Sequence, residues 1–402
     1  MILGLLLILF AVLISTPLLV VGTECLVALF FDTKALPCPD TPEKAIAYKI
    51  LIPAHNEASI VGKTLAKLIA ELPDSNSGPN PENIILIADN CADTTAEIAR
   101  SLGVTVLERN DATHRGKGFA LDFGIQYLRV NSHPDVLVII DADCETSKNS
   151  LIALINLVSV LGKPAQMTNI MRVIDNASIK QKIAGFAWFL KNKIRPLAMY
   201  RMGLPVALTG TGMALPWQLL ESVKVGHGNI VEDMQLGIDC AINGYPPVFC
   251  PDAVVYSDFP EQSSAELTQR TRWEHGHLQT IFHQIPILIK ESYRQKDWRL
   301  FALALDIGVP PLSLLVMISL SGFMALSLLL LITETATAFQ LLLLSFFYFA
   351  AMLTSVWWRY GQAYLSAKEL SGIPQYVISK LSIYFAFIFK RQKEWIRTDR
   401  DV

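Results

Sequence analysis

The stretch VLVIIDAD at residues 136–143 joins five consecutive aliphatic residues to two aspartates that alternate along the chain. A continuous run of this kind, rich in β-branched residues, predicts a strand that is buried on both faces of a parallel sheet. Ligands of such sheets bind beyond the carboxyl ends of the strands, which is where Asp141 and Asp143 fall. The stretch therefore predicts an α/β fold with two carboxylates at a ligand site.

Two earlier segments repeat the same strand, loop and helix pattern. The run KILIP at residues 49–53 is followed by a helical spacing of apolar residues over 60–69, and NIILIA at 83–88 is followed by Asp89 and a helix expected from Thr94. Helices that alternate with buried strands indicate a mostly parallel sheet flanked by helices. Asp89 is then expected at the same edge of the sheet as Asp141.

Composition restricts the class of protein. Of the 402 residues, 52% are hydrophobic and 17% are charged, and the hydrophobic excess collects in residues 1–31 and after Leu300. The net charge of -2, without a basic run that interleaves aromatic residues, excludes a nucleic-acid partner. The six cysteines have no C-x-x-C spacing, which predicts free thiols rather than a zinc site or a disulfide framework.

Three apolar runs are long enough to cross a bilayer as helices, at residues 2–31, 307–332 and 339–358. A cleaved signal peptide is the alternative for the first run, but no basic residues precede it and no small-x-small site follows it. The domain map is then a transmembrane helix at 1–31, a globular domain at 45–300, two transmembrane helices within 301–358, and an interfacial helix with a basic tail at 359–402.

Positive charge predicts the orientation of these segments. Basic residues lie just before the second run and just after the third, at Lys290, Arg294, Lys296, Arg299, Arg359 and Lys368. By the positive-inside rule the 45–300 domain is cytoplasmic. The expectation is an integral, multi-pass protein, placed in a bacterial inner membrane. Residues 373–389 precede a further basic cluster and are expected to be interfacial, with a fourth span as the alternative.

Two cytosolic stretches have the composition of basic amphipathic helices that bind anionic lipid surfaces, at residues 180–201 and 273–299. The alternative is that each is an ordinary surface helix of the globular domain.

Short motifs within the domain have both chemical and structural interpretations. Carboxylates at strand ends are common as helix caps, but the alternation of Asp141 and Asp143 lets one reach a sugar nucleotide and the other a divalent cation. The run RGKG at 115–118 suits a loop that closes on a phosphate or a base, or it is a plain basic turn. It lacks the spacing of a P-loop, and no G-x-G-x-x-G follows a strand, so nucleoside triphosphatase and NAD-binding functions lose support.

An ordered set of motifs carries a resemblance to a known family. The motifs are PAHNE at 53–57, Asp89, DAD at 141–143, ED at 232–233 and QRTRW at 269–273. In this order they resemble the membrane-bound, inverting family 2 glycosyltransferases with a GT-A fold, such as cellulose, chitin, hyaluronan and poly-N-acetylglucosamine synthases and ceramide glucosyltransferase. The departures are the loop after the second strand, which reads ADNCAD at 88–93 where the family has DDGSxD, and the smaller number of spans.

The resemblance implies roles for individual residues. Asp233 would be the catalytic base, within a catalytic group completed by Glu232, Gln269, Arg272 and Trp273. A nucleotide sugar, expected to be a UDP-sugar, would be bound by Pro53, Ala54, Asn56, Glu57, Asp89, Lys117 and Asp141. Thr211, Gly212 and Trp273 would contact the acceptor, and Asp143 would bind Mg²⁺ or Mn²⁺.

Other interpretations of these residues stay open. Glu232 and Asp233 also suit the N-terminus of a helix, where carboxylates are favoured. Trp273 also suits a membrane-interface anchor. His275 and His277 have a spacing that is more typical of packing or polar contacts than of metal ligands.

The implied function is inverting transfer of a sugar to a lipid or growing glycan at the membrane, with a β-linked exopolysaccharide favoured over a single-sugar glycolipid. A hypothesis of another class is a non-catalytic membrane scaffold or transport subunit. The joint presence of Asp141, Asp143, Asp233, Arg272 and Trp273 argues against it. The resemblance identifies neither the sugar nor any partner subunit.

Overall fold

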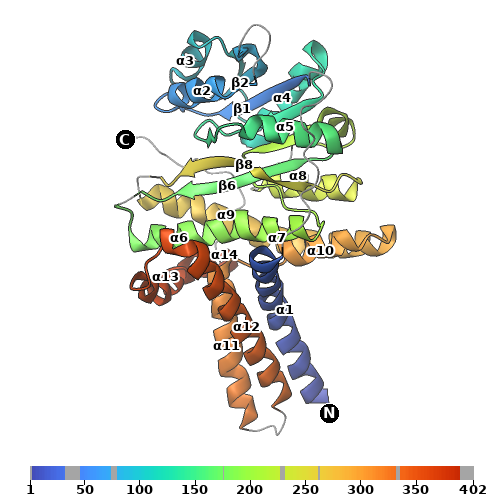
Figure 1. Cartoon of the computed structure of the whole chain (residues 1–402), viewed down its shortest axis with the longest axis vertical. Coiled ribbons are helices and arrows are strands. Elements are labelled where there is room, and N and C mark those ends of the chain that lie inside the picture. Colours follow the sequence, from blue (N-terminus) through green and yellow to red (C-terminus); the bar gives the residue numbers. More distant parts are fainter. Residues whose placement is uncertain are drawn as a thin grey trace. The chain divides into compact units, whose positions relative to one another are not determined.

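The computed structural model describes residues 2–31, 46–73, 79–174, 176–226, 231–260, 263–331 and 336–389. These residues divide into two compact units (Figure 1). The helical unit comprises the described residues of 1–33, 173–204 and 277–392. The sheet unit comprises those of 34–172 and 205–276.

The sheet unit is built on an eight-stranded sheet with the order β3-β2-β1-β4-β7-β6-β8-β5. Its strands are β1 (Tyr48–Ala54), β2 (Ile84–Asp89), β3 (Thr105–Arg109), β4 (Val136–Ile139), β5 (Glu145–Thr146), β6 (Ala165–Arg172), β7 (Met213–Pro216) and β8 (Val248–Asp258). Strands β3, β2, β1 and β4 are parallel, and so are β6 and β8, whereas β7 runs antiparallel to both β4 and β6. The prediction of a mostly parallel α/β sheet is confirmed.

Helices cover both faces of this sheet. They are α2 (Val61–Ala70), α3 (Thr95–Ser101), α4 (Lys117–Asn131), α5 (Ser150–Leu161) and α8 (Glu232–Ile242), with short 3₁₀ turns at η1 (Pro81–Asn83) and η3 (Trp217–Glu221). Along β1, Ile50 belongs to the core that includes α2, α3 and α5, whereas Leu51 belongs to the core that includes α4 and α8. Successive residues of a strand point to opposite faces, so both faces of the central strands must be apolar. This is why β2 and β4 read as unbroken aliphatic runs.

The helical unit contains α1 (Ile2–Phe30), α6 (Ile179–Phe189), a π-helical turn η2 (Leu190–Ile194), α7 (Arg195–Arg201), α10 (Trp298–Ile307), α11 (Leu312–Leu330), α12 (Thr337–Tyr360), η4 (Gly361–Ala363), η5 (Glu369–Gly372), α13 (Ile373–Ser379) and α14 (Leu381–Phe389). Helix α9 (Ser263–Gln295) begins in the sheet unit and continues into the helical unit.

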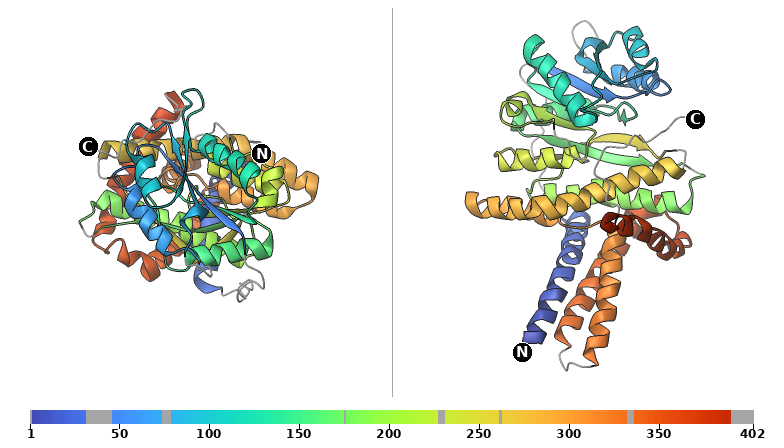
Figure 2. Two further views of the ribbon diagram at one scale, coloured as in Figure 1. Left: turned by 90° about the horizontal axis from the view of Figure 1, so that it is seen from above. Right: turned by 180° about the vertical axis from the view of Figure 1, so that it is seen from behind.

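Helices α1, α11 and α12 run side by side (Figures 1 and 2). Glycines make their close approach feasible, because a Cβ at Gly22 would lie 2.5 Å from the Tyr348 ring and a Cβ at Gly322 would lie 2.8 Å from Ile14. Small residues at helix contacts are typical of packing in membranes, where dispersion rather than the hydrophobic effect drives association.

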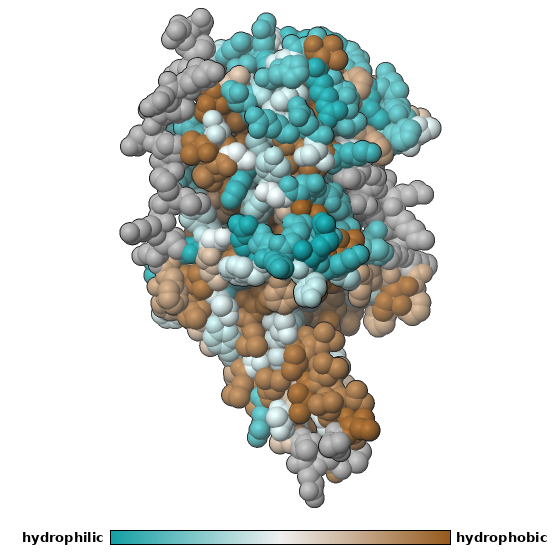
Figure 3. All heavy atoms as spheres, turned by 90° about the vertical axis from the view of Figure 1, so that its right-hand side faces the viewer, coloured by the Kyte–Doolittle hydropathy of each residue, from teal (hydrophilic) through white to brown (hydrophobic). Residues whose placement is uncertain are grey.

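Within the described residues, four helices are long and apolar enough to cross a membrane: Ile2–Phe30, Leu312–Leu330, Thr337–Ala363 and Glu369–Phe389. On the face drawn in Figure 3, hydrophobic side chains dominate the surface of these long apolar helices. Three of the four are the predicted spans. The fourth contains residues 373–389, and it is broken at Lys380 between α13 and α14.

Contacts of this fourth helix involve the amphipathic segments. Phe387 of α14 stacks on Phe282 of α9 at a ring distance of 6.3 Å, and Leu278 packs against Ile383 and Tyr384. The interfacial position of residues 373–389 stays a prediction. Its basic continuation after residue 389 lies outside the described residues.

The segments 173–204 and 277–300 cluster with the long helices, whereas the sequence-based domain map placed them in the 45–300 domain. Glu24, the charged residue of the first apolar run, explains part of this grouping. Arg195 of α7 donates from Nε to the Glu24 carboxylate at 2.6 Å and from Nη2 to the Asp306 carboxylate at 2.5 Å. Arg201 donates to the backbone oxygen of Ala28 at 2.7 Å, near the end of α1. Residues 179–201 are helical, as predicted.

The cysteines of the described residues, Cys25, Cys91, Cys144, Cys240 and Cys250, are free thiols. The prediction of free thiols is confirmed for them, and Cys38 lies outside the described residues.

Candidate active site

The loop after β1 is fastened to the loop after β2. The Asn56 side chain accepts a hydrogen bond from the Ala92 N–H at 2.7 Å, and the Glu57 N–H donates to the Thr95 hydroxyl at 2.8 Å. Asn56 adopts a left-handed conformation with φ 53°, which asparagine tolerates better than most residues. Pro53 and Ala54 lie within β1 itself. The PAHNE motif therefore shapes the rim of the sheet where a nucleotide is expected.

Asp89 ends β2 and is paired with Arg109, which ends β3. Arg109 Nη1 donates to Asp89 Oδ1 at 2.6 Å, and the Asn90 amide donates to the same oxygen at 2.9 Å. Arg109 also donates to the backbone oxygen of His114 at 2.7 Å. No sequence motif marked Arg109. A basic residue at the end of a neighbouring parallel strand was the available signal, but strand β3 had not been predicted.

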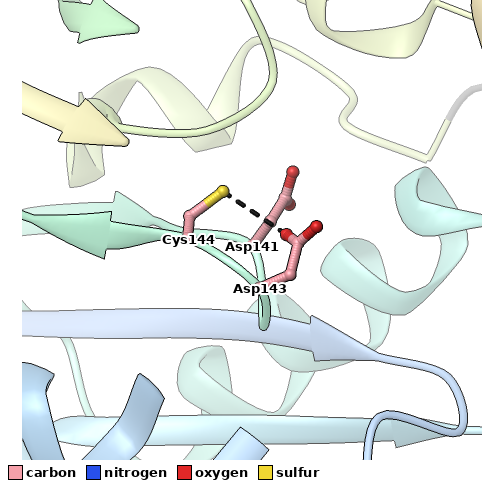
Figure 4. A group of neighbouring side chains, drawn as sticks. All are labelled: Asp141, Asp143 and Cys144. Atoms are coloured by element: carbon pink, nitrogen blue, oxygen red, sulfur yellow. Dashed lines mark hydrogen bonds between the residues drawn. The ribbon is translucent and has the colours of Figure 1, made fainter. Parts of the chain in front are cut away.

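Asp141, Asp143 and Cys144 follow β4 and lie together (Figure 4). Their possible ligand atoms are all within 4.8 Å of one another. Burial raises the pKa of the Cys144 thiol to about 12, and the thiol contacts Ser257 at 3.2 Å and donates to Asp143 at 3.4 Å. A protonated thiol is a poor ligand, whereas carboxylate oxygens are the ligands that Mg²⁺ and Mn²⁺ prefer. The two carboxylates fit such a cation.

Lys117 begins α4 and contributes an ammonium group to the same place. Its Nζ donates to the Asp141 carboxylate and, at 2.7 Å, to the backbone oxygen of Gly210. Burial by itself lowers the pKa of Lys117, but the carboxylates of Asp141, Glu232 and Asp233 outweigh it and raise the pKa above its ordinary value. The lysine therefore stays charged in the protein. Arg115, the other cation of the RGKG run, is exposed.

The loop of residues 209–212 contacts this cluster from another side. Gly210 and Gly212 have φ of 86° and 64°, in the region that favours glycine. A Cβ at Gly210 would lie 3.0 Å from Asp233 Oδ2, and one at Gly212 would lie 2.6 Å from Val255. Thr211 is buried, and its hydroxyl accepts from the Asp141 N–H at 3.1 Å. These residues shape the site, and their contact with an acceptor stays a prediction.

Glu232 and Asp233 form the first turn of α8, as the helix-terminus interpretation expects. Asp233 Oδ1 accepts from the Met234 N–H at 2.8 Å, and its other oxygen faces Gly210. Burial raises the pKa of Glu232 to about 7, with a further contribution from the Asp233 carboxylate and an opposing one from Lys117 and Arg272. Glu232 and Asp233 therefore begin a helix and also belong to the charged cluster.

The QRTRW motif lies in the first half of α9, and Gln269 is buried there. The helix packs closely on the segment before Glu232, because a Cβ at Gly276 would lie 2.6 Å from Val231. The carboxylates of Glu232, Asp141 and Asp233 act on the Arg272 guanidinium, although burial outweighs them and lowers its pKa.

Arg272 Nε is buried without a hydrogen-bond partner among the described residues. A buried N–H group without a partner is costly, so a guanidinium held in this way fits a site that receives an anion. Trp273 follows it and is half-buried, and its role as an acceptor platform or an interface anchor stays a prediction.

His275 and His277 are buried, and neither belongs to the group that could hold a metal among the described residues. His277 Nε2 lies 3.0 Å from the backbone oxygen of Ile307, and burial lowers the pKa of His277 to about 3. A neutral, hydrogen-bonded histidine agrees with the packing interpretation for His277.

Together the sheet unit gathers two cations, Lys117 and Arg272, among the carboxylates of Asp141, Glu232 and Asp233, with Asp143 beside Asp141. Such a set can bind a phosphorylated ligand through its cations, hold a divalent ion through its strand-end carboxylates and present a carboxylate as a base. The predicted residues from four separate motifs therefore meet in one cluster, while Asp89 is engaged by Arg109.

Comparison with known proteins gives a family match. The sequence model of the family described as "Glycosyltransferase like family 2" matches residues 45–276. "Probable glycosyltransferase YdaM" of Bacillus subtilis (strain 168) is 24% identical over 267 residues, which cover 63% of this chain and 60% of that protein. "Uncharacterized protein MJ1222" of Methanocaldococcus jannaschii is 33% identical over 94 residues, 23% of this chain and 34% of that protein. The chain thus spans less than two thirds of either relative.

A solved structure matches nearly the whole chain. The mannosyltransferase PcManGT from Pyrobaculum calidifontis, described in complex with GDP-Man and Mn²⁺, aligns with a TM-score of 0.54 at 14% identity, covering 96% of this chain and 100% of that chain. At this identity the likeness concerns the fold alone. It confirms the prediction of a GT-A-like fold with long apolar helices.

Proposed function

This chain belongs to the glycosyltransferase-like family 2, and on that premise we propose that it transfers a sugar from a nucleotide sugar to an acceptor at a membrane. The prediction of a glycosyltransferase is confirmed at the level of the family. The observation that carries the proposal is the buried Nε of Arg272, which has no protein partner among the described residues and belongs to one cluster with Lys117 and the Asp141 carboxylate.

A nucleoside diphosphate is the anion that this cluster suits. Its leaving phosphate would be met by Arg272, whose planar fork of donors matches phosphate oxygens, and by the Lys117 ammonium. Asp143 and Asp141 would hold a divalent cation, which would neutralise the charge of the diphosphate when bound. The complex of PcManGT with GDP-Man and Mn²⁺ supports this class of donor and cation by analogy of fold.

We propose Asp233 as the base. Its Oδ2 faces Gly210, whose backbone oxygen holds Lys117, and its Oδ1 is fixed by the Met234 N–H. The acceptor hydroxyl would give its proton to Asp233 while its oxygen bonds to the anomeric carbon. The bond from that carbon to the phosphate oxygen would break, and the nucleoside diphosphate would leave. This single displacement inverts the anomeric centre.

The proposed donor is a nucleotide sugar whose nucleoside and sugar are to be identified by experiment. The UDP-sugar expectation rests on the family resemblance, whereas PcManGT is described with GDP-Man. Asp89, which lies at the edge of the sheet where we expect the nucleoside, is paired with Arg109. We propose that the two side chains together contact the nucleobase of the donor.

The four helices long and apolar enough to cross a membrane, found among the described residues, support an acceptor that is a lipid or a growing glycan. We propose a β-linked exopolysaccharide as the product. A single-sugar glycolipid is the outcome that would replace it. We propose a cytoplasmic catalytic domain at a bacterial inner membrane. The positive charge that flanks the second and third apolar runs supports the cytoplasmic orientation.

The test uses purified full-length protein in lipid nanodiscs with a panel of UDP- and GDP-sugars and either Mg²⁺ or Mn²⁺. Nucleotide release is measured for each donor, and the product is identified by mass spectrometry. One donor is expected to give release and a glycosylated product. Folded protein that releases nucleotide from no donor would favour the non-catalytic scaffold instead, and a product with one sugar on a lipid would replace the polysaccharide.

A further inference from the structure

Gln166 is a buried amide in the middle of the sheet. It lies on β6 with an exposed fraction of 2%, where β6 pairs with β7 on one side and β8 on the other. Its neighbours Ala165 and Met167 are core residues. An amide at such a position is costly unless its donors and acceptor are all used.

Both polar atoms of this amide are hydrogen-bonded to backbone groups of residues 209–212, and Nε2 also to the backbone of Met167. Oε1 accepts from the Thr209 N–H at 2.8 Å. Nε2 donates to the backbone oxygens of Thr211 at 2.9 Å and Gly212 at 3.2 Å, and to that of Met167 at 3.0 Å. One side chain therefore ties both ends of the 209–212 loop to β6.

This loop contacts three groups of the candidate active site. The Gly210 oxygen accepts from Lys117, the Thr211 hydroxyl accepts from the Asp141 N–H, and Gly210 lies against Asp233. Its two glycines, both with positive φ, give its backbone little conformational preference of its own. The loop therefore depends on outside contacts to keep one conformation.

We propose that Gln166 is a positioning residue for the transfer reaction: its amide fixes the 209–212 loop, and the loop in turn places the Lys117 ammonium between Asp141 and Asp233. This inference rests on the proposed function. Chemistry favours glutamine here because the site needs one acceptor and two donors at once. A neutral group also adds no charge near the charged side chains of Lys117, Asp141 and Asp233.

The competing explanation is that Gln166 only fills the core. Gln166→Met keeps the volume of the side chain but removes the acceptor and both donors, so the two explanations differ in what they predict. If Gln166 is a positioning residue, kcat falls by about 10- to 100-fold, because small displacements of catalytic groups have effects of this size. The KM for the donor changes much less.

The matched control is Asn169→Leu on the same strand. Asn169 is as buried as Gln166, and its Oδ1 has no hydrogen-bond partner among the described residues. Both variants change a buried amide to an apolar side chain. A shared loss of thermal stability with equal kcat values would show that burial alone matters and would overturn the proposal.

Gln166→Glu gives a second, independent readout through pH. A neutral carboxylic acid can accept from Thr209 and donate one hydrogen bond, whereas a carboxylate would face the oxygens of Thr211 and Gly212. The ratio of kcat for this variant to kcat for the wild type should therefore fall as the pH rises from about 6 to about 9. A flat ratio contradicts the proposal, including in the case where Gln166→Met does not fold.

Hydrogen exchange separates this inference from the proposed function. In full-length protein, Gln166→Met should increase amide exchange in peptides that cover residues 209–212, and Asn169→Leu should not. If the wild type releases nucleotide from no donor, the proposed function fails while exchange still decides whether Gln166 holds the loop. If the wild type is active and loop exchange is unchanged in Gln166→Met, the inference alone fails.

Discussion

Two clusters of charged side chains, one in each unit, differ in how their guanidinium groups are hydrogen-bonded. In the helical unit the Arg195 guanidinium donates directly to the carboxylates of Glu24 and Asp306, and to the backbone oxygen of Asp306. All three residues lie far apart in the chain and meet on one guanidinium. This cluster is an internal network of opposite charges.

In the sheet unit the charges act on one another but are only partly bonded. Lys117 is hydrogen-bonded to Asp141. The carboxylates of Glu232 and Asp141 attract the Arg272 guanidinium electrostatically, but its Nε has no hydrogen-bond partner among the described residues. We call the first network closed because its guanidinium pairs with two carboxylates, although Glu24 Oε1 has no hydrogen-bond partner among the described residues. We call the second network open because the Arg272 Nε donor has no partner there. We expect the closed cluster to stabilise the fold and the open one to bind a substrate, and four changes test this expectation.

The largest effect is expected for Asp233→Asn, which removes the proposed base from the open cluster. Transfer should fall by about 10²- to 10⁴-fold, the usual contribution of a general base, while binding of the nucleotide sugar is largely retained. Nucleotide release and donor titration by calorimetry measure the two quantities. Asp239→Asn on the same helix, whose carboxylate accepts from Gln235, is the control. Turnover like that of the wild type would remove Asp233 as the base.

Arg195→Met, in the closed cluster, should reduce the stability of the protein, whereas Asp233→Asn reduces its activity. It leaves the Glu24 and Asp306 carboxylates buried without their cation, which typically costs about 3–5 kcal/mol of stability. Thermal unfolding in detergent measures the loss. The triple replacement Arg195→Met, Glu24→Gln, Asp306→Asn should recover much of it. Equal stability of the single variant and the wild type would mean that the network contributes nothing.

Glu232→Gln should stabilise the protein at the expense of activity. The folded-state pKa of Glu232, about 7, is above its ordinary value of 4.5, so the folded protein holds this proton more tightly than the unfolded chain. Stability contributed by the proton is therefore present at low pH and is lost as the pH rises from about 4.5 to about 7.

The glutamine avoids this loss, so the free energy of unfolding at about pH 8 should exceed that of the wild type by up to about 3 kcal/mol and match it at about pH 4. Melting curves at both pH values measure the difference. A gain that is equal at the two pH values would point to packing rather than to ionisation.

The smallest effect is expected for the cation. Asp143→Asn should raise the concentration of Mn²⁺ or Mg²⁺ needed for half-maximal activity by at least about tenfold, because a neutral amide binds hard cations less well than a carboxylate. Activity is titrated with each metal after treatment with a chelator. Asp252→Asn, an exposed position on β8, is the control and should titrate like the wild type. An unchanged titration in Asp143→Asn would exclude this residue as a ligand.

Much of the fold was predictable because it follows from local patterns. The aliphatic runs before Asp89 and Asp141 became β2 and β4, and residues 180–201 became a continuous run of helix. Period and composition are properties of neighbouring residues, and burial of both strand faces requires an unbroken apolar run. Strand β3 was not predicted, since its residues are only partly buried and carry charges.

Some residues of the candidate site could be predicted from the sequence, and others could not. Asp141 could be predicted from its place after an apolar strand, whereas Glu232 and Arg272 were indicated by the resemblance of their motifs to a known family. Arg109 and Gln166 could not, since their importance comes from the residues that they contact. Nothing in the residues beside Gln166 indicates that it ties a loop more than forty positions away.

The sequence by itself determined the α/β class, the long apolar helices and the carboxylates at the strand ends. Each is written in the order of apolar and polar residues along a short segment. Only the tertiary structure decided which charges are closed and which stay open. Arg195 reaches Glu24 across 171 positions, and Lys117 reaches Gly210 across 93. Such contacts depend on how the strands and helices are connected in space, which no local pattern encodes.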